Sequence, residues 1–290
     1  MLKNHQNKIS LDQLASFSAW PARLLSLENF EIKHKTPESI TREFGEDKWG
    51  KLLQYFHRKD NFSLADVEEM EQNIDEIIPC FEHDIGFYLS SAKDAHKKQI
   101  EIFKENLIPF IDDASGLVEL GAGYGSKLFS LSEIQPFNDL PLFAAEYTQS
   151  GCDLIKLIAD KIDKDVKVGR CDFDKLYLDD IEIPENSIIF TSYSVHYVPS
   201  LKTKFIDFIL KLKPKVVIHF EPCYEYFDEL SLYGLMCKRY MEINGYTLNI
   251  ASAITEGCIK NEIKFQEQKN IFGTNPFLPF SIVKWFPNHK

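Results

Sequence analysis

The sequence predicts an α/β fold, in which a mainly parallel seven-stranded sheet ends in a C-terminal antiparallel hairpin and follows an N-terminal helical domain. Three observations support this prediction. Apolar runs of strand length alternate with amphipathic helices from residue 96 onward, a glycine-rich turn follows the first run, and two short alternating segments lie near the end of the chain. Such alternation favours a parallel sheet covered on both faces. We therefore divide the chain into a helical domain, residues 1–95, and an α/β domain, residues 96–290.

Composition and charge exclude some classes of protein for this chain. It has 290 residues, 44% hydrophobic and 13% aromatic, enough for one extended core or two unequal domains. A formal net charge of −11 argues against a nucleic-acid partner, because binding to phosphates needs clustered Lys and Arg. The first residues lack the apolar core of a signal peptide, and no stretch approaches the ~18 apolar residues of a membrane span. We expect a cytoplasmic protein with no membrane partner.

Residues that bind metals do not cluster in the sequence. The six cysteines lack C-x-x-C spacing, so neither a zinc site nor a disulfide framework is predicted; they are Cys80, Cys152, Cys171, Cys223, Cys237 and Cys258. We expect them to be reduced and half-buried. An Asp-rich stretch is interpreted as solvated loop charge; it contains Asp172, Asp174, Asp179 and Asp180. We therefore expect no metal.

Helical spacing dominates the segment from Ser10 to Ser91. The strongest apolar stripe repeats at i, i+3, i+4 and i+7 and consists of Trp49, Leu52, Leu53 and Phe56. Thr36 and Ser63 are expected helix N-caps, since Thr36 precedes a proline and Ser63 has an acid three residues later. No β alternation of useful length occurs here. The segment is therefore predicted to be helical.

The α/β domain begins with a helix, residues 98–111, and a buried strand, Leu117–Leu120. A turn then carries glycines at Gly121, Gly123 and Gly125, in the pattern G-x-G-x-G. Glycine tolerates positive φ and lets the backbone approach a ligand closely. The dinucleotide-binding fingerprint instead spaces its glycines as G-x-G-x-x-G, which disfavours a dehydrogenase.

This turn, with Glu119 two residues before its first glycine, resembles motif I of the class I S-adenosylmethionine (SAM) dependent methyltransferases. The resemblance implies a Rossmann-like fold in which residues 96–290 form the SAM-binding catalytic domain. It implies that Gly121, Ala122 and Gly123 pass under the amino-acid end and ribose of SAM, and that Glu119 orients the amino group. It also implies that the N-terminal helices form a lid over the active site; a structural or dimerising domain, and hence a homodimer, is the alternative.

The strands that follow continue the resemblance in the expected order. Leu142–Glu146 ends in Glu146, about 20 residues from the turn, where the family holds the ribose hydroxyls. The third strand, residues 166–173, implies a hydrogen bond from the adenine amino group to Asp172 and places Phe173 beside the ring. The fourth strand, residues 187–191, opens into the acceptor site, and Ser192 completes the expected cofactor contacts.

Residues just after the fourth and fifth strands are the candidates for catalysis, because ligands bind beyond the carboxyl ends of parallel strands. His196 is the expected general base, since its ordinary pKa suits proton removal near neutral pH; a loop histidine that bonds a carbonyl is the alternative. Tyr193 is the second expected catalytic residue. Ser194, Tyr197 and Glu221 are expected to bind the acceptor, although for Tyr193, Ser194 and Tyr197 taken singly ordinary wall packing is the favoured role.

The end of the chain contains the fifth strand and the terminal hairpin. The fifth strand covers residues 215–222, and His219 within it is expected to be a core histidine. A helix is predicted from residue 225 to about 241, with an aromatic stripe of Tyr226, Tyr233 and Tyr240. Residues 262–266 and 281–286 both alternate, which predicts an antiparallel hairpin.

These observations favour a SAM-dependent methyltransferase that methylates oxygen or nitrogen of a small-molecule acceptor by in-line transfer. An alternative keeps SAM but breaks another bond: attack on the aminocarboxypropyl chain releases methylthioadenosine, either in an aminocarboxypropyl transferase or in a cyclase that forms azetidine-2-carboxylate. Motif I does not distinguish these reactions, because it binds only the cofactor and does not decide which carbon the nucleophile attacks. A non-catalytic module with a degenerate SAM fold is a third possibility.

Overall fold

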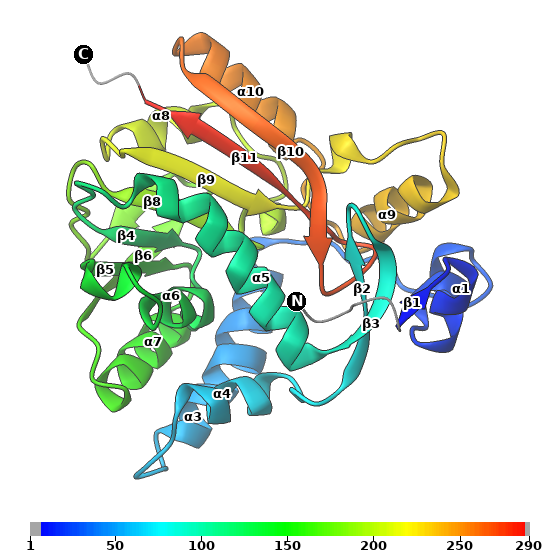
Figure 1. The fold of residues 1–290 in the computed structure, drawn as a ribbon, viewed down its shortest axis with the longest axis horizontal. Coiled ribbons are helices and arrows are strands. Elements are labelled where there is room, and N and C mark those ends of the chain that lie inside the picture. The colour runs from blue at the N-terminus through cyan, green and yellow to red at the C-terminus, as the bar shows by residue number, and fades with distance from the viewer. Residues whose placement is uncertain (1–6, 288–290) are drawn as a thin grey trace.

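The computed structural model describes residues 7–287, and within them eleven strands form one mixed sheet (Figure 1). The strand order is β1-β3-β2-β10-β11-β9-β8-β4-β5-β6-β7. Residues 1–6 lie outside the described residues. The expectation about a signal peptide rests mostly on these residues, so the structure does not bear on it. In the described part, no helix is both long and apolar enough to cross a membrane.

Five neighbouring parallel strands form the centre of the sheet. They are β4 (Leu117–Leu120), β5 (Leu142–Glu146), β6 (Val166–Asp172), β8 (Ile188–Ser192) and β9 (Val216–Glu221). Each lies within one residue of its expected position. Every residue of β4, β5, β8 and β9 is buried, as expected for strands covered on both faces. The parallel register brings their carboxyl ends to one edge of the sheet.

The predicted terminal hairpin is also present, as β10 (Lys264–Gly273) and β11 (Phe280–Phe286), with β11 antiparallel to β9. Strand β10 is longer than expected because it continues through an irregularity between Gln268 and Phe272. Beyond this irregularity, Phe272 and Gly273 pair with a further strand, β2. A short strand, β7 (Tyr177–Asp179), extends the opposite edge.

The prediction that the first 95 residues are helical is wrong in part. This segment contains β1 (Lys8–Ile9), β2 (Ile77–Glu82) and β3 (Gly86–Ser91), and these strands extend the main sheet from seven strands to eleven together with β7. The run Ile77–Phe81 is apolar and interrupted by Pro79, so it lacks the alternation by which strands are found. Strand β2 pairs along its length with β3, and it joins the main sheet through β10, which lies almost 200 residues away in the sequence.

Three predicted N-terminal helices are present. They are α2 (Pro37–Ile40), α3 (Trp49–Phe56) and α4 (Leu64–Glu71), and a π-helix, Thr41–Lys48, joins α2 to α3. A further short helix, α1 (Trp20–Leu24), was not predicted. The expected caps are confirmed, because Thr36 accepts a hydrogen bond from the Ser39 amide and Ser63 accepts one from the Asp66 amide.

Helices cover both faces of the sheet (Figure 1). On one face lie α3, α4, α5 (Ala92–Leu107), α6 (Ser126–Ser132) and α7 (Gln149–Lys161), and on the other lie α8 (Lys204–Leu210) and α10 (Ile250–Lys260). Helix α5 begins earlier than predicted because Ser91 caps it. Short 3-10 helices occur at Asp12–Ser16, Ile108–Phe110, Phe137–Asp139, Val195–Tyr197 and Tyr224–Tyr226. All six cysteines are buried and unpaired, rather than half-buried.

A third apolar cluster joins the N-terminal residues Leu14 and Leu24 to α9 (Leu232–Ile243). Helix α9 begins later than predicted, and Tyr226 lies before it, so the expected stripe of three tyrosines on one helix is wrong. Sequence reasoning also missed α10, although Ile250, Ile254 and Cys258 have helical spacing and are buried.

We predict that Phe103→Ala lowers the free energy of unfolding by about 3–5 kcal/mol, as expected for removing a large buried ring. Phe103 lies on α5 and stacks on Phe220 of β9 with ring centroids 3.9 Å apart, so it joins the helix to the sheet. Urea denaturation followed by circular dichroism measures the change. Leu230→Ala is the control, because Leu230 is 97% exposed and its loss should change stability by less than about 0.5 kcal/mol.

Candidate functional site

A cavity of about 540 Å³ lies at the carboxyl edge of the parallel strands, within the range of small-molecule sites. All eight residues predicted to bind the cofactor line it: Glu119, Gly121, Ala122, Gly123, Glu146, Asp172, Phe173 and Ser192. Ser194, Tyr193 and Tyr197 line it as well. The fold thus brings side chains from β4, β5, β6 and β8 to one hollow, which the register of the parallel strands requires.

The glycine turn has little spare room. Gly121 has a φ of +75°, and a Cβ at this position would lie 2.4 Å from the Ser194 Cβ. The Gly121 and Ala122 amides donate hydrogen bonds to the Ala145 carbonyl, at 2.7 and 3.1 Å. These two N–H groups are therefore satisfied within the protein and do not bind a ligand. The turn instead lets a ligand come close to the backbone, because its glycines lack side chains.

Glu119 is a buried acid in the wall of the cavity. Its Oε2 accepts a hydrogen bond from the Leu128 amide at 3.2 Å, whereas no protein donor bonds its Oε1 within the described residues. Burial raises the pKa of Glu119 to about 8, and the nearby charge of Lys127 opposes this change. A cationic ligand group beside Glu119 would favour its ionised form.

Glu146, at the end of β5, links the glycine turn to the next helix. Its Oε2 accepts from the Gly123 amide at 3.0 Å, and its Oε1 accepts from the amide and the hydroxyl of Thr148, both at 3.1 Å. Thr148 in turn caps α7. Burial raises the pKa of Glu146, although these hydrogen bonds favour the carboxylate. The acid is thus fixed in place before any ligand binds.

The ends of β6 and β8 supply the remaining polar groups of the wall. Asp172 Oδ1 accepts hydrogen bonds from the Asp174 and Lys175 amides at 2.9 and 2.8 Å, which leaves Oδ2 facing only the more distant Lys175 ammonium, 3.7 Å away. Phe173 packs edge-on against Phe205. The Ser192 hydroxyl is buried and has no hydrogen-bond partner in the described part of the chain. An unsatisfied buried hydroxyl beside a cavity is typical of a ligand site.

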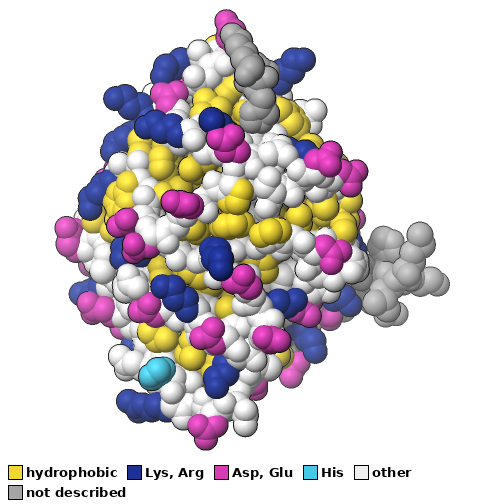
Figure 2. All heavy atoms as spheres, turned by 90° about the vertical axis from the view of Figure 1, so that its left-hand side faces the viewer, with side chains coloured by type: hydrophobic (Ala, Val, Ile, Leu, Met, Phe, Trp, Pro, Cys, Tyr) yellow, Lys and Arg dark blue, Asp and Glu magenta, His cyan; other side chains and the backbone are white. Residues whose placement is uncertain are grey.

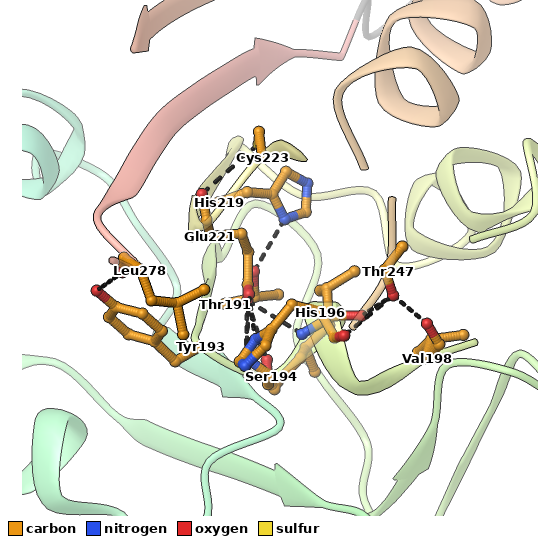
Figure 3. Close-up of polar contacts among 12 residues, drawn as sticks. Thr191, Tyr193, Ser194, His196, Val198, His219, Glu221, Cys223, Thr247 and Leu278 are labelled. Atoms are coloured by element: carbon orange, nitrogen blue, oxygen red, sulfur yellow. Dashed lines mark hydrogen bonds and ion pairs between the residues drawn. The ribbon is translucent and has the colours of Figure 1, made fainter. Parts of the chain in front are cut away.

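The position of Tyr193 differs from the expectation of a catalytic hydroxyl. Its hydroxyl donates a hydrogen bond to the Leu278 carbonyl at 2.9 Å (Figure 3). Burial raises the pKa of Tyr193 well above its ordinary value. The structure therefore does not support proton transfer by this hydroxyl, and Tyr193 lines the cavity with its ring.

His196 and Glu221 do not line the cavity, which corrects the expectation for both. The Ser194–Tyr197 loop crosses the end of β9, where the Ser194 amide donates a hydrogen bond to Glu221 and the His196 ring of the same loop lies beside that carboxylate (Figure 3). His196 is 1% exposed, its ring packs against Tyr197, and burial lowers its pKa. The structure does not support His196 as a general base or Glu221 as a direct acceptor ligand.

The expectation that His219 is a satisfied core histidine is confirmed. Its Nε2 accepts a hydrogen bond from the Trp285 indole at 3.0 Å, so its Nδ1 carries the proton and donates to the Thr191 hydroxyl, also at 3.0 Å. Burial lowers the pKa of His219 to about 4.

Sequence reasoning did not identify the residues of two walls of the cavity. Residues of the segment 37–49 form one of them, including Ile40, Phe44 and Trp49, with Trp49 against Tyr124 and Phe44 against Tyr197. The other contains Gln99 of α5 together with Thr274, Asn275 and Leu278 of the β10–β11 connection. The resemblance implied that the N-terminal helices cover the active site, but the apolar stripe that includes Trp49 predicted only a helix and not which residues reach the cavity.

Within residues 7–287, no three or more His, Cys, Asp or Glu side chains are grouped so that they could hold a metal ion. The Asp-rich stretch is used in other ways: Asp172 binds backbone amides, and Asp174 pairs with Lys202.

No family model matches this sequence, and no curated protein matches it. Solved structures are similar in fold. Magnesium protoporphyrin IX methyltransferase from Synechocystis PCC 6803, with bound S-adenosylhomocysteine (SAH), is 9% identical, and the match covers 87% of this chain and 100% of that chain with a TM-score of 0.51.

Two further structures are similar at lower TM-scores. Geranyl diphosphate C-methyltransferase from Streptomyces coelicolor A3(2) is 12% identical, with 82% of this chain and 97% of that chain covered and a TM-score of 0.49. Small RNA methyltransferase HEN1 is 16% identical, with 67% of this chain covered and a TM-score of 0.48, and the match spans 25% of the HEN1 chain. The Synechocystis structure, which matches over most of both chains, shows that this chain shares its Rossmann-like α/β fold.

Proposed function

We propose that this protein is a SAM-dependent methyltransferase that acts on a small-molecule acceptor. One observation carries the proposal: the glycine turn and the carboxylates of Glu119, Glu146 and Asp172, from three consecutive parallel strands, line one cavity. The residues present fit SAM, because the unsatisfied Ser192 hydroxyl and the free Oε1 of Glu119 leave polar groups for a ligand. The cavity volume is also suitable for a ligand of this size.

Each cofactor residue has a proposed partner on SAM. Glu119 holds the amino group, Glu146 the ribose hydroxyls and Asp172 the adenine amino group, while Phe173 lies beside the adenine ring. When bound, SAM supplies an electrophilic methyl group on a sulfonium that is already a good leaving group. The buried, prearranged carboxylates support this assignment, because they cost little further ordering when a ligand binds.

The chain's own contribution to methyl transfer is alignment and exclusion of water. Tyr193 and Tyr197 offer aromatic walls, and Gln99 and Asn275 offer neutral polar groups on the acceptor side. Holding reactants in line at near-attack distance lowers a barrier by several kcal/mol, about 7–11 in the best cases. Since His196 lies outside the cavity, we assign the rate enhancement to alignment rather than to a histidine base.

A small acceptor is favoured by the cover over the cavity and by the distribution of charge. Ile40, Phe44 and Trp49 close one side, which suits a substrate enclosed away from water. Over most of the face drawn in Figure 2, Lys and Arg side chains are interspersed with Asp and Glu, although several basic side chains lie together along its upper left edge. The net charge of −11 adds to this argument against a phosphate backbone. Within the N-terminal 95 residues, we propose that the segment 37–49 is the lid.

Product analysis tests the reaction. The protein is incubated with SAM alone and with SAM plus a panel of small oxygen and nitrogen nucleophiles, and the adenosyl products are separated by liquid chromatography. We expect SAH that depends on one class of acceptor. Methylthioadenosine would instead assign the reaction to the aminocarboxypropyl chain, and failure to bind SAM or SAH in calorimetry would contradict any SAM-dependent activity.

We predict that Gly121→Ala weakens SAH binding at least tenfold. The added Cβ is strained at a positive φ and meets the Ser194 side chain at 2.4 Å, so the Ser194–Tyr197 loop must shift. Calorimetry measures the affinity. Ser194→Gly in the same chain removes the clashing atoms and should restore part of the loss. Unchanged affinity in Gly121→Ala would contradict the placement of the turn at the ligand.

We predict that SAH binding releases a proton from Glu119 near pH 7. In the free protein the pKa of Glu119 is about 8, so the group is mostly protonated at pH 7, and a ligand ammonium beside it favours the ionised form. Affinity should therefore rise between pH 6 and pH 8. Calorimetry in two buffers of different ionisation enthalpy counts the protons. Glu119→Gln should abolish this release, whereas a pH-independent affinity of the unaltered protein would refute the assignment.

A further inference from the structure

Glu221 is a buried carboxylate at the end of β9, beneath the loop that forms part of the cavity wall (Figure 3). Its oxygens accept hydrogen bonds from the Ser194 amide at 3.0 Å, the Val195 amide at 3.2 Å and the Ser194 hydroxyl at 3.2 Å. His196 Nδ1 lies 3.4 Å from the other oxygen. Four donors thus converge on one acid, and they hold the loop against the sheet.

Within the described residues, the side chain that could pair with Glu221 as a cation is His196, and it does so only when it is protonated. Burial alone would raise the pKa of Glu221, but the hydrogen bond and the charge attraction from His196, together with the hydrogen bonds from the Ser194 and Val195 amides, hold this pKa below its ordinary value, so Glu221 is ionised. His196 is neutral near pH 7, because burial lowers its pKa. The nearby Lys35 is already paired with Glu43. A buried, unpaired negative charge is costly, so a compensating positive charge is expected close to it.

The cavity is where such a positive charge fits. The Ser194 side chain bonds Glu221 on one side and lies against Gly121 of the cofactor turn on the other. Burial is the main cause of the raised pKa values of Glu119, Tyr193 and Tyr197, which line the cavity, and the charge of Glu221 adds to the rise in each. The field of this carboxylate therefore reaches the space that a ligand would occupy.

We propose that the buried charge of Glu221 makes the cavity prefer a cation at the sulfur position, so that the sulfonium of SAM binds more tightly than the neutral thioether of SAH. The inference rests on the proposed function. Glu221 acts as a positioning residue that touches no substrate, and it acts through both the loop and its field. Methyl transfer leaves the sulfur neutral, so the same charge favours release of the product over the substrate.

Glu221→Gln separates the two effects of this residue. Glutamine has the same length as glutamate, and its Oε1 still accepts hydrogen bonds from the Ser194 and Val195 amides. Its NH2 group donates a hydrogen bond to Nδ1 of a neutral His196, whose proton then lies on Nε2. The substitution therefore retains the loop contacts and removes the charge. Glu221→Asp is the complement, since it retains the charge and shortens the side chain.

The experiment measures dissociation constants by calorimetry for SAM, for sinefungin, which carries an ammonium near the sulfur position, and for SAH. We expect both cationic ligands to bind the unaltered protein more tightly than SAH. In Glu221→Gln the ratio of the SAH constant to the SAM constant should fall about tenfold, the order expected for one buried charge acting on another at an effective dielectric of about 20. In Glu221→Asp the ratio should persist while all three ligands weaken.

His219→Gln is the matched control, because it alters a buried polar residue of the same strand without changing a charge, and it should leave the ratio unchanged. Equal weakening of SAM and SAH in Glu221→Gln would overturn the proposal. If that variant does not fold, the unaltered protein still decides: SAH binding as tightly as SAM and sinefungin would overturn it. Absence of binding by all three ligands would instead contradict the proposed function itself.

Discussion

The contact between the glycine turn after β4 and the Ser194–Tyr197 loop after β8 is the constraint on which the rest of the site depends. Gly121 lies so close to Ser194 that no side chain fits between them. The Ala145 carbonyl fixes the turn from one side, and Glu221 fixes the loop from the other. Because β4 and β8 are adjacent parallel strands, the turn and the loop follow them at the same edge of the sheet, and the cavity forms between two rigid backbone segments.

Buried acids are the common chemical feature of this edge of the sheet. Glu119, Glu146, Asp172 and Glu221 lie at or near the ends of four of the five parallel strands, and each accepts at least one hydrogen bond from a backbone amide. Backbone donors stabilise carboxylates without supplying a full positive charge. The edge as a whole therefore favours a cationic ligand, and SAM carries both an ammonium and a sulfonium.

The N-terminal and C-terminal parts of the chain complete the site together. Strand β2 extends the sheet by pairing with β10, and the connection after β10 supplies one wall of the cavity. The segment 37–49 supplies another wall through Phe44 and Trp49. Residues distant in sequence thus line the space that the parallel strands leave open.

The sequence by itself determined the parallel centre, the terminal hairpin and the residues that line the cavity at the ends of β4, β5 and β6, because strand period, glycine turns and acids at strand ends are local signals. Only the tertiary structure decided the pairing of β2 with β10 and the cover by Trp49, since these depend on contacts between distant segments. The same holds for His196 and Glu221. Their positions after a strand predicted the cavity, but the fold of one loop across β9 placed them behind its wall, and no local pattern encodes that crossing.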